Sequence, residues 1–371
     1  MPDTRSTGVV ITRRRWLTGM LAAAALPAVA ACGRGDAANA GAGPTVTDLT
    51  GRTVVLPGPV RRVVTIPMPA ASMMIAVAGR PDVLAGMNAA SASAIRTGFL
   101  GEVYPQLLSV RTDVAGAEFA PNVESVLAAE PDVVIQWGDR GAGILDPLTN
   151  AGLTVVSLTY GTQDDLEGAV TLYGELLGAQ ERSKRIVDGM RARRTRLTER
   201  RPTGTSPSVL YMFGDADGFP VAGAGSYNHF VTELVGARNP AGAIAQQRAT
   251  IGIEQLLAWD PDIILLGNFG PALPADLYGN PALASLRAVR ERRVYKVPLG
   301  GYRWDPPSQE SPLMWEWLAG LVRRTGAPGL RSGVVRDYEF LYGTAPSAAQ
   351  LDTILQVRAN AGSSDYADFG R

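Results

Sequence analysis

The amino-acid sequence predicts an α/β protein of two lobes with mostly parallel sheets, joined by a long helical connector. Three observations support this fold class. A helix-then-strand pattern occurs twice, strand-like runs alternate with helix-like segments, and one helical stretch extends over residues 163–200. Alternating strands and helices are typical of parallel β/α architecture. We therefore expect two related lobes of ordinary domain size.

The repeated pattern spans residues 122–135 and 252–265. In each copy a Glu, Glu124 or Glu254, stands seven residues before a Pro-Asp pair, and a Val-Val-Ile or Ile-Ile-Leu run follows at once. Proline cannot continue a helix and biases its predecessor away from helical geometry, so a short helix must end there. Apolar runs without polar alternation are expected of strands buried on both faces of a sheet. Each unit therefore presents one Glu near the start of its helix.

The N-terminus has the features of an export signal. A basic segment (Arg-Arg-Arg-Trp-Leu, residues 13–17) precedes an Ala-rich apolar stretch that is too short for a comfortable membrane span. The stretch ends in Val-Ala-Ala-Cys at Cys32, the single cysteine, which resembles a bacterial lipobox and makes Cys32 the predicted lipidation site. The order Arg-Arg-x-Trp-Leu resembles a twin-arginine signal. An ordinary secretory signal with an incidental Cys is the alternative, and the export route stays open.

The chain divides into six predicted segments. The Gly- and Ala-rich composition after Cys32 is typical of a flexible tether. The segments are a signal peptide (1–31), a tether (32–44), an N-terminal lobe (45–162), a helical connector (163–200), a C-terminal lobe (201–345), and a C-terminal helix and tail (346–371).

Within the N-terminal lobe, the sequence predicts a hairpin over residues 45–56 that turns at Thr50-Gly51. A small-residue helix over 70–78 ends at Gly79. The other predicted elements are strands at 61–66, 84–87, 132–137 and 154–158 and helices at 122–129 and 146–151.

The connector is predicted as two helices that break at Gly178, with an apolar stripe on the first and an Arg-rich solvated face on the second. Its second helix, of about 20 residues, would span roughly 30 Å. In the C-terminal lobe we expect a glycine-rich loop over 214–225 and a disordered end after the last helix. The other predicted elements are strands at 208–213, 262–266 and 293–297, a loop at 300–305, and helices at 227–234, 253–259, 280–288, 312–323 and 347–357.

Composition excludes several function classes. With one Cys, at the lipidation site, and one His, the chain can form neither a Cys-His dyad nor a two-imidazole metal site. No P-loop and no Gly-x-Ser-x-Gly elbow occur, and we expect His229 to be a helix residue near a cleft rather than a metal ligand. After residue 31 the chain carries 31 basic and 34 acidic residues, so no nucleic-acid footprint is indicated. A binding protein without metal or cofactor is favoured over an enzyme.

Together these features resemble the solute-binding lipoproteins of ABC importers, and specifically the periplasmic-binding class III group that carries ferric siderophores, haem and cobalamin. The resemblance covers about residues 45–345. It is supported by the repeated Glu-to-Pro-Asp unit and the long connector. Weaker matches are Arg-Arg-Val-Val at 61–64, Gly-Ser-Tyr at 225–227 with the run at 234–240, and the run at 286–295.

The resemblance implies partners and a location. Glu124 and Glu254 match the acids that dock such binders onto basic pockets of the permease dimer, and charge complementarity of this kind sets orientation and on-rate. The alternative is that both are first-turn helix acids favoured by the helix dipole. We expect a monomer on the outer face of the cytoplasmic membrane, held there by its lipid anchor. Because long connectors limit hinge motion, we also expect modest lobe closure on ligand binding.

The ligand cleft is predicted between the lobes, at the carboxyl ends of the strands. Trp137, Tyr227, Arg303 and Trp304 are the first candidates, since aromatic faces with Arg suit a large, partly apolar, anionic ligand; the alternative is that these aromatic side chains only pack the loops. Other candidates lie in the post-strand loops at 67–72, 137–140, 160, 213–219, 268–269 and 302–305.

The expected ligand is a ferric siderophore or a related metal chelate. Cobalamin, haem and an oxyanion such as molybdate remain alternatives within the same fold. A haem site would need an axial side chain, for which Met212, Tyr227 and His229 are available. A surface enzyme or adhesion module on this fold is the alternative outside transport, and the absence of catalytic residue sets argues against the enzyme.

Overall fold

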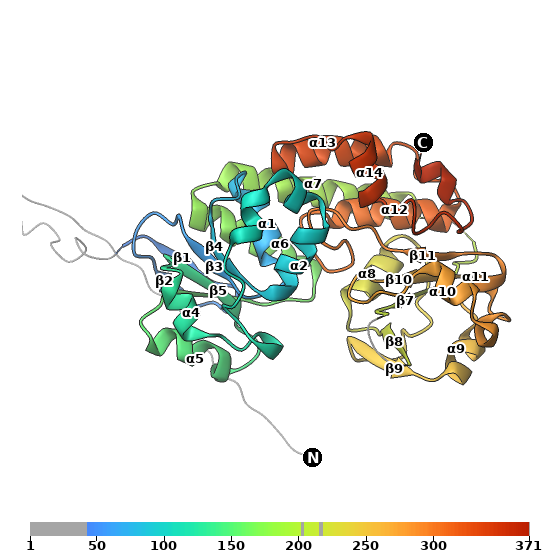
Figure 1. Cartoon of the computed structure of the whole chain (residues 1–371), viewed down its shortest axis with the longest axis horizontal. Coiled ribbons are helices and arrows are strands. Elements are labelled where there is room, and N and C mark those ends of the chain that lie inside the picture. The colour runs from blue at the N-terminus through green and yellow to red at the C-terminus, as the bar shows by residue number, and fades with distance from the viewer. Residues whose placement is uncertain (1–42, 202–203, 215–217, 371) are drawn as a thin grey trace, which may run out of the picture. The chain divides into compact units, whose positions relative to one another are not determined.

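The computed structural model describes residues 43–201, 204–214 and 218–370, and it confirms the predicted α/β fold class. A two-stranded hairpin, a four-stranded sheet and a five-stranded sheet are surrounded by helices (Figure 1). The predicted signal peptide, Cys32 and most of the predicted tether lie outside the described residues. Among the residues that are described, no helix has the length and apolar character needed to cross a bilayer.

The hairpin forms as predicted. β1 (Thr45–Thr47) pairs antiparallel with β2 (Thr53–Val55), and Gly51 adopts a positive φ of 83° in the turn. The buried side chain of Asp48 organises this turn, because its Oδ1 accepts hydrogen bonds from the amides of Thr50 (3.0 Å) and Arg52 (3.1 Å). Its Oδ2 accepts from the amide of Ser157 (3.2 Å) and so ties the hairpin to the first sheet.

The first sheet is wholly parallel, with the order β4-β3-β5-β6. Every residue of β3, β5 and β6 is buried, as expected of strands covered on both faces. The strands are β3 (Val63–Thr65), β4 (Leu84–Met87), β5 (Val133–Trp137) and β6 (Val155–Leu158). The helical segments around them are α1 (Ala70–Ala78), α2 (Ala89–Thr97), α3 (Phe99–Val103), η1 (Pro105–Ser109), η2 (Ala117–Phe119), α4 (Val123–Ala128) and α5 (Ala142–Asn150).

The second sheet is mixed, with the order β11-β10-β7-β8-β9. Three strands are parallel, whereas β8 pairs antiparallel with both of its neighbours. Its strands are β7 (Val209–Met212), β8 (Phe219–Ala222), β9 (Arg248–Ile251), β10 (Ile263–Leu266) and β11 (Val294–Lys296). The surrounding helical segments are α8 (Tyr227–Leu234), α9 (Ile253–Trp259), α10 (Pro274–Tyr278), η3 (Pro281–Leu283) and α11 (Arg287–Arg290).

The sequence repeat corresponds to α4-β5 in one sheet and α9-β10 in the other, as predicted. The Asp of each Pro-Asp pair has the same structural role. Asp132 Oδ2 accepts hydrogen bonds from the amides of Arg61 (2.7 Å) and Arg62 (2.8 Å), just before β3. Asp262 Oδ2 accepts from the amide of Ser208 (2.8 Å), just before β7. Each Asp therefore holds the start of the neighbouring strand beside its own.

The connector forms two helices, α6 (Gln163–Leu177) and α7 (Gln180–Glu199), which break at Gly178 in the left-handed conformation as predicted. The predicted stripe of α6 is buried through Leu166, Val170, Tyr173 and Leu176. Helix α12 (Ser311–Arg323) contacts both α7 and α13 (Leu330–Tyr342), and α13 also contacts α1 (Figure 1). The C-terminal segment adds α14 (Ala348–Ile354) and η4 (Tyr366–Gly370).

Some local predictions are wrong. The predicted loop at 214–225 contains strand β8, and β9 was not predicted; together they make this sheet mixed. Residues 280–288 form η3 and part of α11 rather than one helix, α5 begins at Ala142, and α13 was not predicted. The expected disordered end instead packs against α12: Tyr366 and Phe369 are buried, and Trp317 Nε1 donates a hydrogen bond to the Tyr366 hydroxyl (3.0 Å).

Candidate functional site

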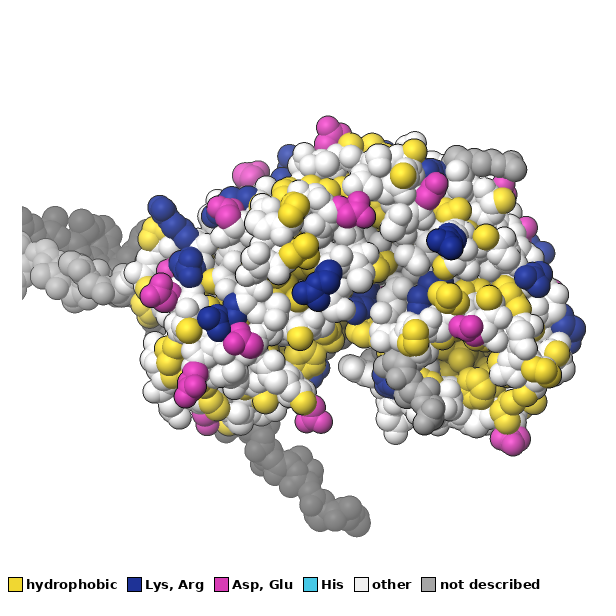
Figure 2. All heavy atoms as spheres, in the orientation of Figure 1, with side chains coloured by type: hydrophobic (Ala, Val, Ile, Leu, Met, Phe, Trp, Pro, Cys, Tyr) yellow, Lys and Arg dark blue, Asp and Glu magenta, His cyan; other side chains and the backbone are white. Residues whose placement is uncertain are grey.

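A cavity of about 240 Å³ lies where loops from both sheets meet. Most of its lining follows the carboxyl ends of β3, β5, β6, β7, β10 and β11, the edge at which ligands bind in open α/β sheets. In the space-filling view, hydrophobic side chains border the hollow between the parts that carry the two sheets (Figure 2). The lining residues are Met68, Phe119, Trp137, Arg140, Tyr160, Gly161, Phe213, Ser226, Tyr227, Asn228, Gln247, Arg248, Phe269, Asp305, Pro306 and Pro307.

One wall of the cavity is an aromatic cluster from the first sheet. Trp137 contacts Tyr160 with ring centroids 4.9 Å apart and Phe119 at 6.3 Å, both edge to face. The guanidinium of Arg140 lies over Trp137, 4.7 Å from its centroid. Gln136 positions the cluster, since its Nε2 donates a hydrogen bond to the carbonyl of Phe119 (3.2 Å) and its Oε1 accepts from the Trp137 amide (2.8 Å). Trp137 Nε1 is buried and has no hydrogen-bond partner among the described residues.

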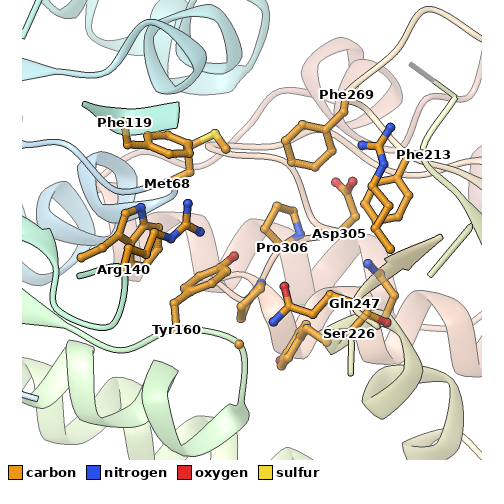
Figure 3. A pocket seen from close by; sticks show the side chains of 16 residues that line it. Met68, Phe119, Arg140, Tyr160, Phe213, Ser226, Gln247, Phe269, Asp305 and Pro306 are labelled. Atoms are coloured by element: carbon orange, nitrogen blue, oxygen red, sulfur yellow. The ribbon is translucent and has the colours of Figure 1, made fainter. Parts of the chain in front are cut away.

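The opposite wall comes from the second sheet and repeats the combination of Arg with aromatic rings. The guanidinium of Arg248 lies 4.6 Å from the centroid of Phe213, and Phe213 packs edge to face on Tyr211 at 5.0 Å. Figure 3 shows Phe119, Arg140 and Tyr160 on one side of the cavity and Phe213, Phe269 and Gln247 on the other. Each wall therefore offers one cation beside an apolar ring.

Arg140, Arg248 and Asp305 are the charged residues of the lining. Both Arg side chains are exposed, whereas Asp305 is buried. Burial raises the pKa of the Asp305 carboxyl above its ordinary value, although the Tyr211 hydroxyl that donates to its Oδ2 and the charge of Arg303 lower it. The described lining therefore carries two Arg side chains and one acid.

Tyr160 and Tyr227 lie against this lining as neutral phenols. Burial raises the pKa of the Tyr160 hydroxyl well above its ordinary value, and nearby Tyr302, Asp305 and Tyr227 add to that effect. Burial also raises the pKa of Tyr227, whose hydroxyl donates a hydrogen bond to Gln163 Oε1 on α6 (2.8 Å). Tyr227 therefore joins the second-sheet wall to the connector.

The structure brings two of the four predicted ligand residues to the cavity. Trp137 and Tyr227 line it, whereas Arg303 and Trp304 do not. The guanidinium of Arg303 donates hydrogen bonds to the carbonyls of Asn268 (3.1 Å) and Ala90 (3.2 Å), so it ties the loop after β10 to the first turn of α2. Arg303 is therefore outside the described cavity lining, and its contact with a ligand stays a prediction.

Trp304 is likewise a core residue rather than a lining residue. Its side chain is fully buried, and its Nε1 donates a hydrogen bond to Glu310 Oε2 (2.6 Å). Glu310, also fully buried, accepts from the hydroxyls of Tyr338 and Tyr342 on α13. The predicted loop at 302–305 does reach the cavity, but the residue of this loop that lines it is Asp305, one position after Trp304.

The sequence analysis does not identify several of the residues that line the cavity. Phe119 follows no strand, and Gln247 and Arg248 lie at the start of β9, which was not predicted. Pro306 and Pro307 directly extend the predicted loop at 302–305, so a wider window would have included them. The sequence carries no signal that places Arg248 opposite Arg140.

The two acids of the repeat occupy matching positions. Glu124 and Glu254 are exposed second residues of α4 and α9. In each helix the next apolar side chain, Val126 or Leu256, is fully buried. The residue after it is an exposed Leu: Leu127 is 45% exposed and Leu257 is 36% exposed. These are two of the five large hydrophobic side chains exposed on the described part of the chain.

His229 lies in the first turn of α8, where its amide donates to Ser226 Oγ (3.1 Å). Its ring Nδ1 lies 3.4 Å from Asn239 Nδ2, and the ring does not line the cavity. Within the described ranges, no three His, Cys, Asp or Glu side chains are grouped so that they could hold a metal ion.

Comparison with known proteins gives related matches. A family model described as periplasmic binding protein matches residues 110–299. The molybdate-binding protein MolA of Haemophilus influenzae is 22% identical over 243 residues, which cover 59% of this chain and 69% of that protein. The Fe(3+)-citrate-binding protein YfmC of Bacillus subtilis is 23% identical over 184 residues, 48% of this chain and 58% of that protein. A periplasmic solute binding protein from Veillonella parvula superimposes with a TM-score of 0.79 at 28% identity, covering 86% of this chain and 98% of that one.

Proposed function

The chain belongs to the periplasmic binding protein family, and from this premise we propose that it is a lipid-anchored receptor that captures a ferric siderophore or related metal chelate for an ABC permease. Members of this family bind small ligands and deliver them to such permeases, and they are not enzymes. The chelate, the anchor and the monomeric state are parts of the proposal. Cys32 would carry the lipid.

One observation carries the choice of ligand: each wall of the cavity presents a guanidinium beside aromatic rings, Arg140 with Trp137 and Arg248 with Phe213. A chelate of a ferric ion with an organic acid has negative oxygen atoms and carbon-rich faces. Guanidinium groups bind carboxylate oxygens through paired donors, and the rings accept the apolar faces. The curated relative YfmC is named for binding Fe(3+)-citrate, a ligand of this chemistry.

The size and the lining of the cavity argue against haem and cobalamin. Its volume of about 240 Å³ lies below the ~300–1,000 Å³ of sites for drug-sized ligands. Of the three side chains considered as axial haem ligands, Met212 and His229 do not line the cavity, and the Tyr227 hydroxyl is bonded to Gln163. The volume therefore favours a compact metal chelate over a macrocycle, and by the same measure over a large siderophore.

Molybdate is the second candidate, because the curated relative MolA is named for binding it. A bare oxyanion is best held by many converging donors in a small polar site. The lining instead combines two Arg side chains with Phe119, Phe213 and Phe269. This apolar character favours an organic chelate.

We propose that the permease contacts the paired surface made by Glu124 and Leu127 on α4 and by Glu254 and Leu257 on α9. The two carboxylates suit basic pockets on two similar subunits, and each Leu adds an apolar contact one turn along the same helix face. The core does not need these leucines, since Val126 and Leu256 already bury the inner face. The same exposed pair on two separate helices supports a partner with two similar binding sites.

The proposal is tested by tryptophan fluorescence of the chain from residue 33 to 371. Ferric citrate, ferric hydroxamates, ferric catecholates, haem, cobalamin and molybdate are titrated separately. Trp137 is the one Trp of the described lining, so we expect saturable quenching by one ferric chelate that is lost in Trp137→Phe. Trp259→Phe, on α9 away from the cavity, should keep the quench.

Two results would count against this function. Saturation by molybdate without any response to ferric chelates would select the second candidate. A folded protein that responds to none of the six would remove the support for a metal-chelate receptor.

A further inference from the structure

Asp305 is the only acidic residue in the described lining, and its carboxyl group is incompletely bonded. The residue is 1% exposed. The Tyr211 hydroxyl donates to Oδ2, but Oδ1 is buried and has no hydrogen-bond partner among the described residues. The amides of Asn268 and Asp305 lie close enough to lower the pKa of the carboxyl, yet neither makes a hydrogen bond with Oδ1.

The local sequence explains why Oδ1 lacks a partner. An Asp side chain in a loop usually accepts a hydrogen bond from a backbone amide two residues further along. Here the next two residues are Pro306 and Pro307, which have no N–H to donate. The Asp-Pro-Pro sequence therefore removes the donors that would otherwise satisfy this carboxylate from its own chain.

Neighbouring cations do not supply the missing bond either. Lys296 Nζ donates to the carbonyls of Gly267 (2.8 Å), Gly270 (2.9 Å) and Ala272 (3.0 Å), which uses its three protons. Arg303 bonds two backbone carbonyls and the Tyr302 hydroxyl. Both cations are occupied in holding loops, so Asp305 forms no ion pair with either of them.

An acceptor left unsatisfied in this way destabilises the free protein, and more than nine in ten buried polar groups in folded proteins do find a partner. Figure 3 shows the carboxyl group of Asp305 between the rings of Phe269 and Phe213, at the border of the cavity. Because Asp305 lines the cavity, a ligand seated there would lie beside this carboxyl group.

We infer that Oδ1 of Asp305 accepts a hydrogen bond from the bound ligand, so that the ligand carries a hydroxyl, N–H or metal-bound water donor in addition to its anionic groups. This inference rests on the proposed function and narrows it. A ligand made only of acceptor oxygens would place negative charge against a buried carboxylate, where the low dielectric strengthens repulsion. A ferric chelate of a hydroxy acid, or an aqua complex, meets the requirement, and molybdate does not.

The test compares the wild type with Asp305→Asn. The Asn side chain can still accept from Tyr211 while its amide N–H₂ replaces Oδ1, which converts an acceptor in the cavity into a donor. Asp139→Asn is the matched control, because Asp139 is exposed, lies next to Arg140 and is outside the lining. The probes are ferric citrate, whose hydroxyl and metal-bound water can donate, and sodium molybdate. Affinity is measured by fluorescence titration, and unliganded stability by thermal unfolding.

For Asp305→Asn we expect about 10- to 100-fold weaker ferric citrate binding, the loss typical of a hydrogen bond to a charged group. Molybdate binding should become tighter, and the unliganded variant should unfold at the same or a higher temperature. Asp139→Asn should match the wild type in all three measurements.

Unchanged ferric citrate affinity in Asp305→Asn would overturn the inference. A lower unfolding temperature of the unliganded variant would do the same, since it would mean that the free carboxylate already has a partner. If the wild type prefers molybdate, the proposed function fails. In that case, molybdate affinity that is unchanged or weaker in Asp305→Asn would overturn the Asp305 inference as well. Tighter molybdate binding by Asp305→Asn would support the Asp305 inference. If neither probe binds, the proposed function fails only when the other four ligands of the titration also give no response, and the unfolding comparison still decides whether Oδ1 lacks a partner.

Discussion

Replacing Arg140 by Gln tests whether the cation of the first-sheet wall recognises an anionic ligand. The guanidinium stacks 4.7 Å from the centroid of Trp137 and 5.4 Å from that of Phe119, and it forms no ion pair with any described residue. Stacking on two rings restricts its position, so its donors are aimed before the ligand arrives. Gln keeps a polar side chain but removes the charge and the paired donors.

The expected loss follows from the distance and the exposure of the charge. An anionic oxygen about 4 Å from the guanidinium would gain about 4 kcal/mol at the effective dielectric near a protein surface. Because Arg140 is exposed and binding displaces its water, the net value should lie nearer the 1.5–3 kcal/mol of a hydrogen bond to a charged group. A loss of about 2–3 kcal/mol corresponds to roughly 30- to 150-fold weaker binding.

The assay is a fluorescence titration with ferric citrate at several salt concentrations. Salt screens exposed charges over about 8 Å at physiological ionic strength, so the affinity of the wild type should fall with salt and that of Arg140→Gln should fall less. Arg96→Gln, an equal charge change on exposed α2 outside the lining, should match the wild type. Equal affinity and equal salt dependence of Arg140→Gln and the wild type would refute the role assigned to this cation.

Three further predictions concern docking, stability and closure. Charge reversal of both Glu124 and Glu254 to Lys should abolish uptake in cells while leaving ligand affinity in solution unchanged, because both acids are exposed and neither lines the cavity. Asp48→Asn should lower the free energy of unfolding by about 1–3 kcal/mol in denaturant titrations, since the buried carboxylate accepts several hydrogen bonds. Burial alone would raise the pKa of the Asp48 carboxyl, but its hydrogen bonds lower this pKa below the ordinary value. The ionised Asp48 therefore stabilises the fold at a pH above the ordinary carboxyl pKa. This stabilisation is lost as the pH falls through the lowered pKa of the folded protein. Small-angle scattering should show only a small change in radius of gyration on ligand binding, because α6 and α7 join the lobes.

Each of these predictions has its own control. Reversal of Glu181 and Glu199, two exposed acids of α7, changes the net charge equally and should preserve uptake; loss of ligand binding in the docking variant would sink the docking assignment. An Asp48→Asn variant whose stability and acid sensitivity equal those of the wild type would contradict the account of the hairpin. A large contraction on binding would contradict a stiff connector.

The sequence predicted the fold best where one local signal was sufficient. The Pro-Asp pairs end α4 and α9 and start β5 and β10, and Gly178 breaks the connector, because proline and glycine act through their own backbone. Strand β8 was missed because it lies inside a glycine-rich stretch and contains Pro220. It pairs antiparallel with β9, a partner distant in sequence, and such pairing depends on tertiary packing more than on local propensity.

The site was predicted at the level of loops and not of side chains. The sequence analysis favours the aromatic and basic residues of the loop at 302–305. Trp304 turns inward because the buried carboxylate of Glu310, which also accepts from the Tyr338 hydroxyl of α13, accepts its indole N–H. The sequence shows an acid, Glu310, six residues after Trp304, but it does not show that this acid is buried and accepts the indole N–H. The next residue, Asp305, then faces the cavity.

The loop at 302–305 also contains a sequence signal for the role of Asp305. Asp-Pro-Pro predicts a carboxylate without local amide donors, because both prolines lack an N–H. The oxygens of such a carboxylate must accept hydrogen bonds from another segment of the chain, from water, or from a ligand. The structure buries Asp305 and provides one side-chain donor, Tyr211, for its two oxygens. The remaining oxygen defines what a ligand must bring, so in this chain the absence of backbone donors is more informative about function than the aromatic residues that precede it.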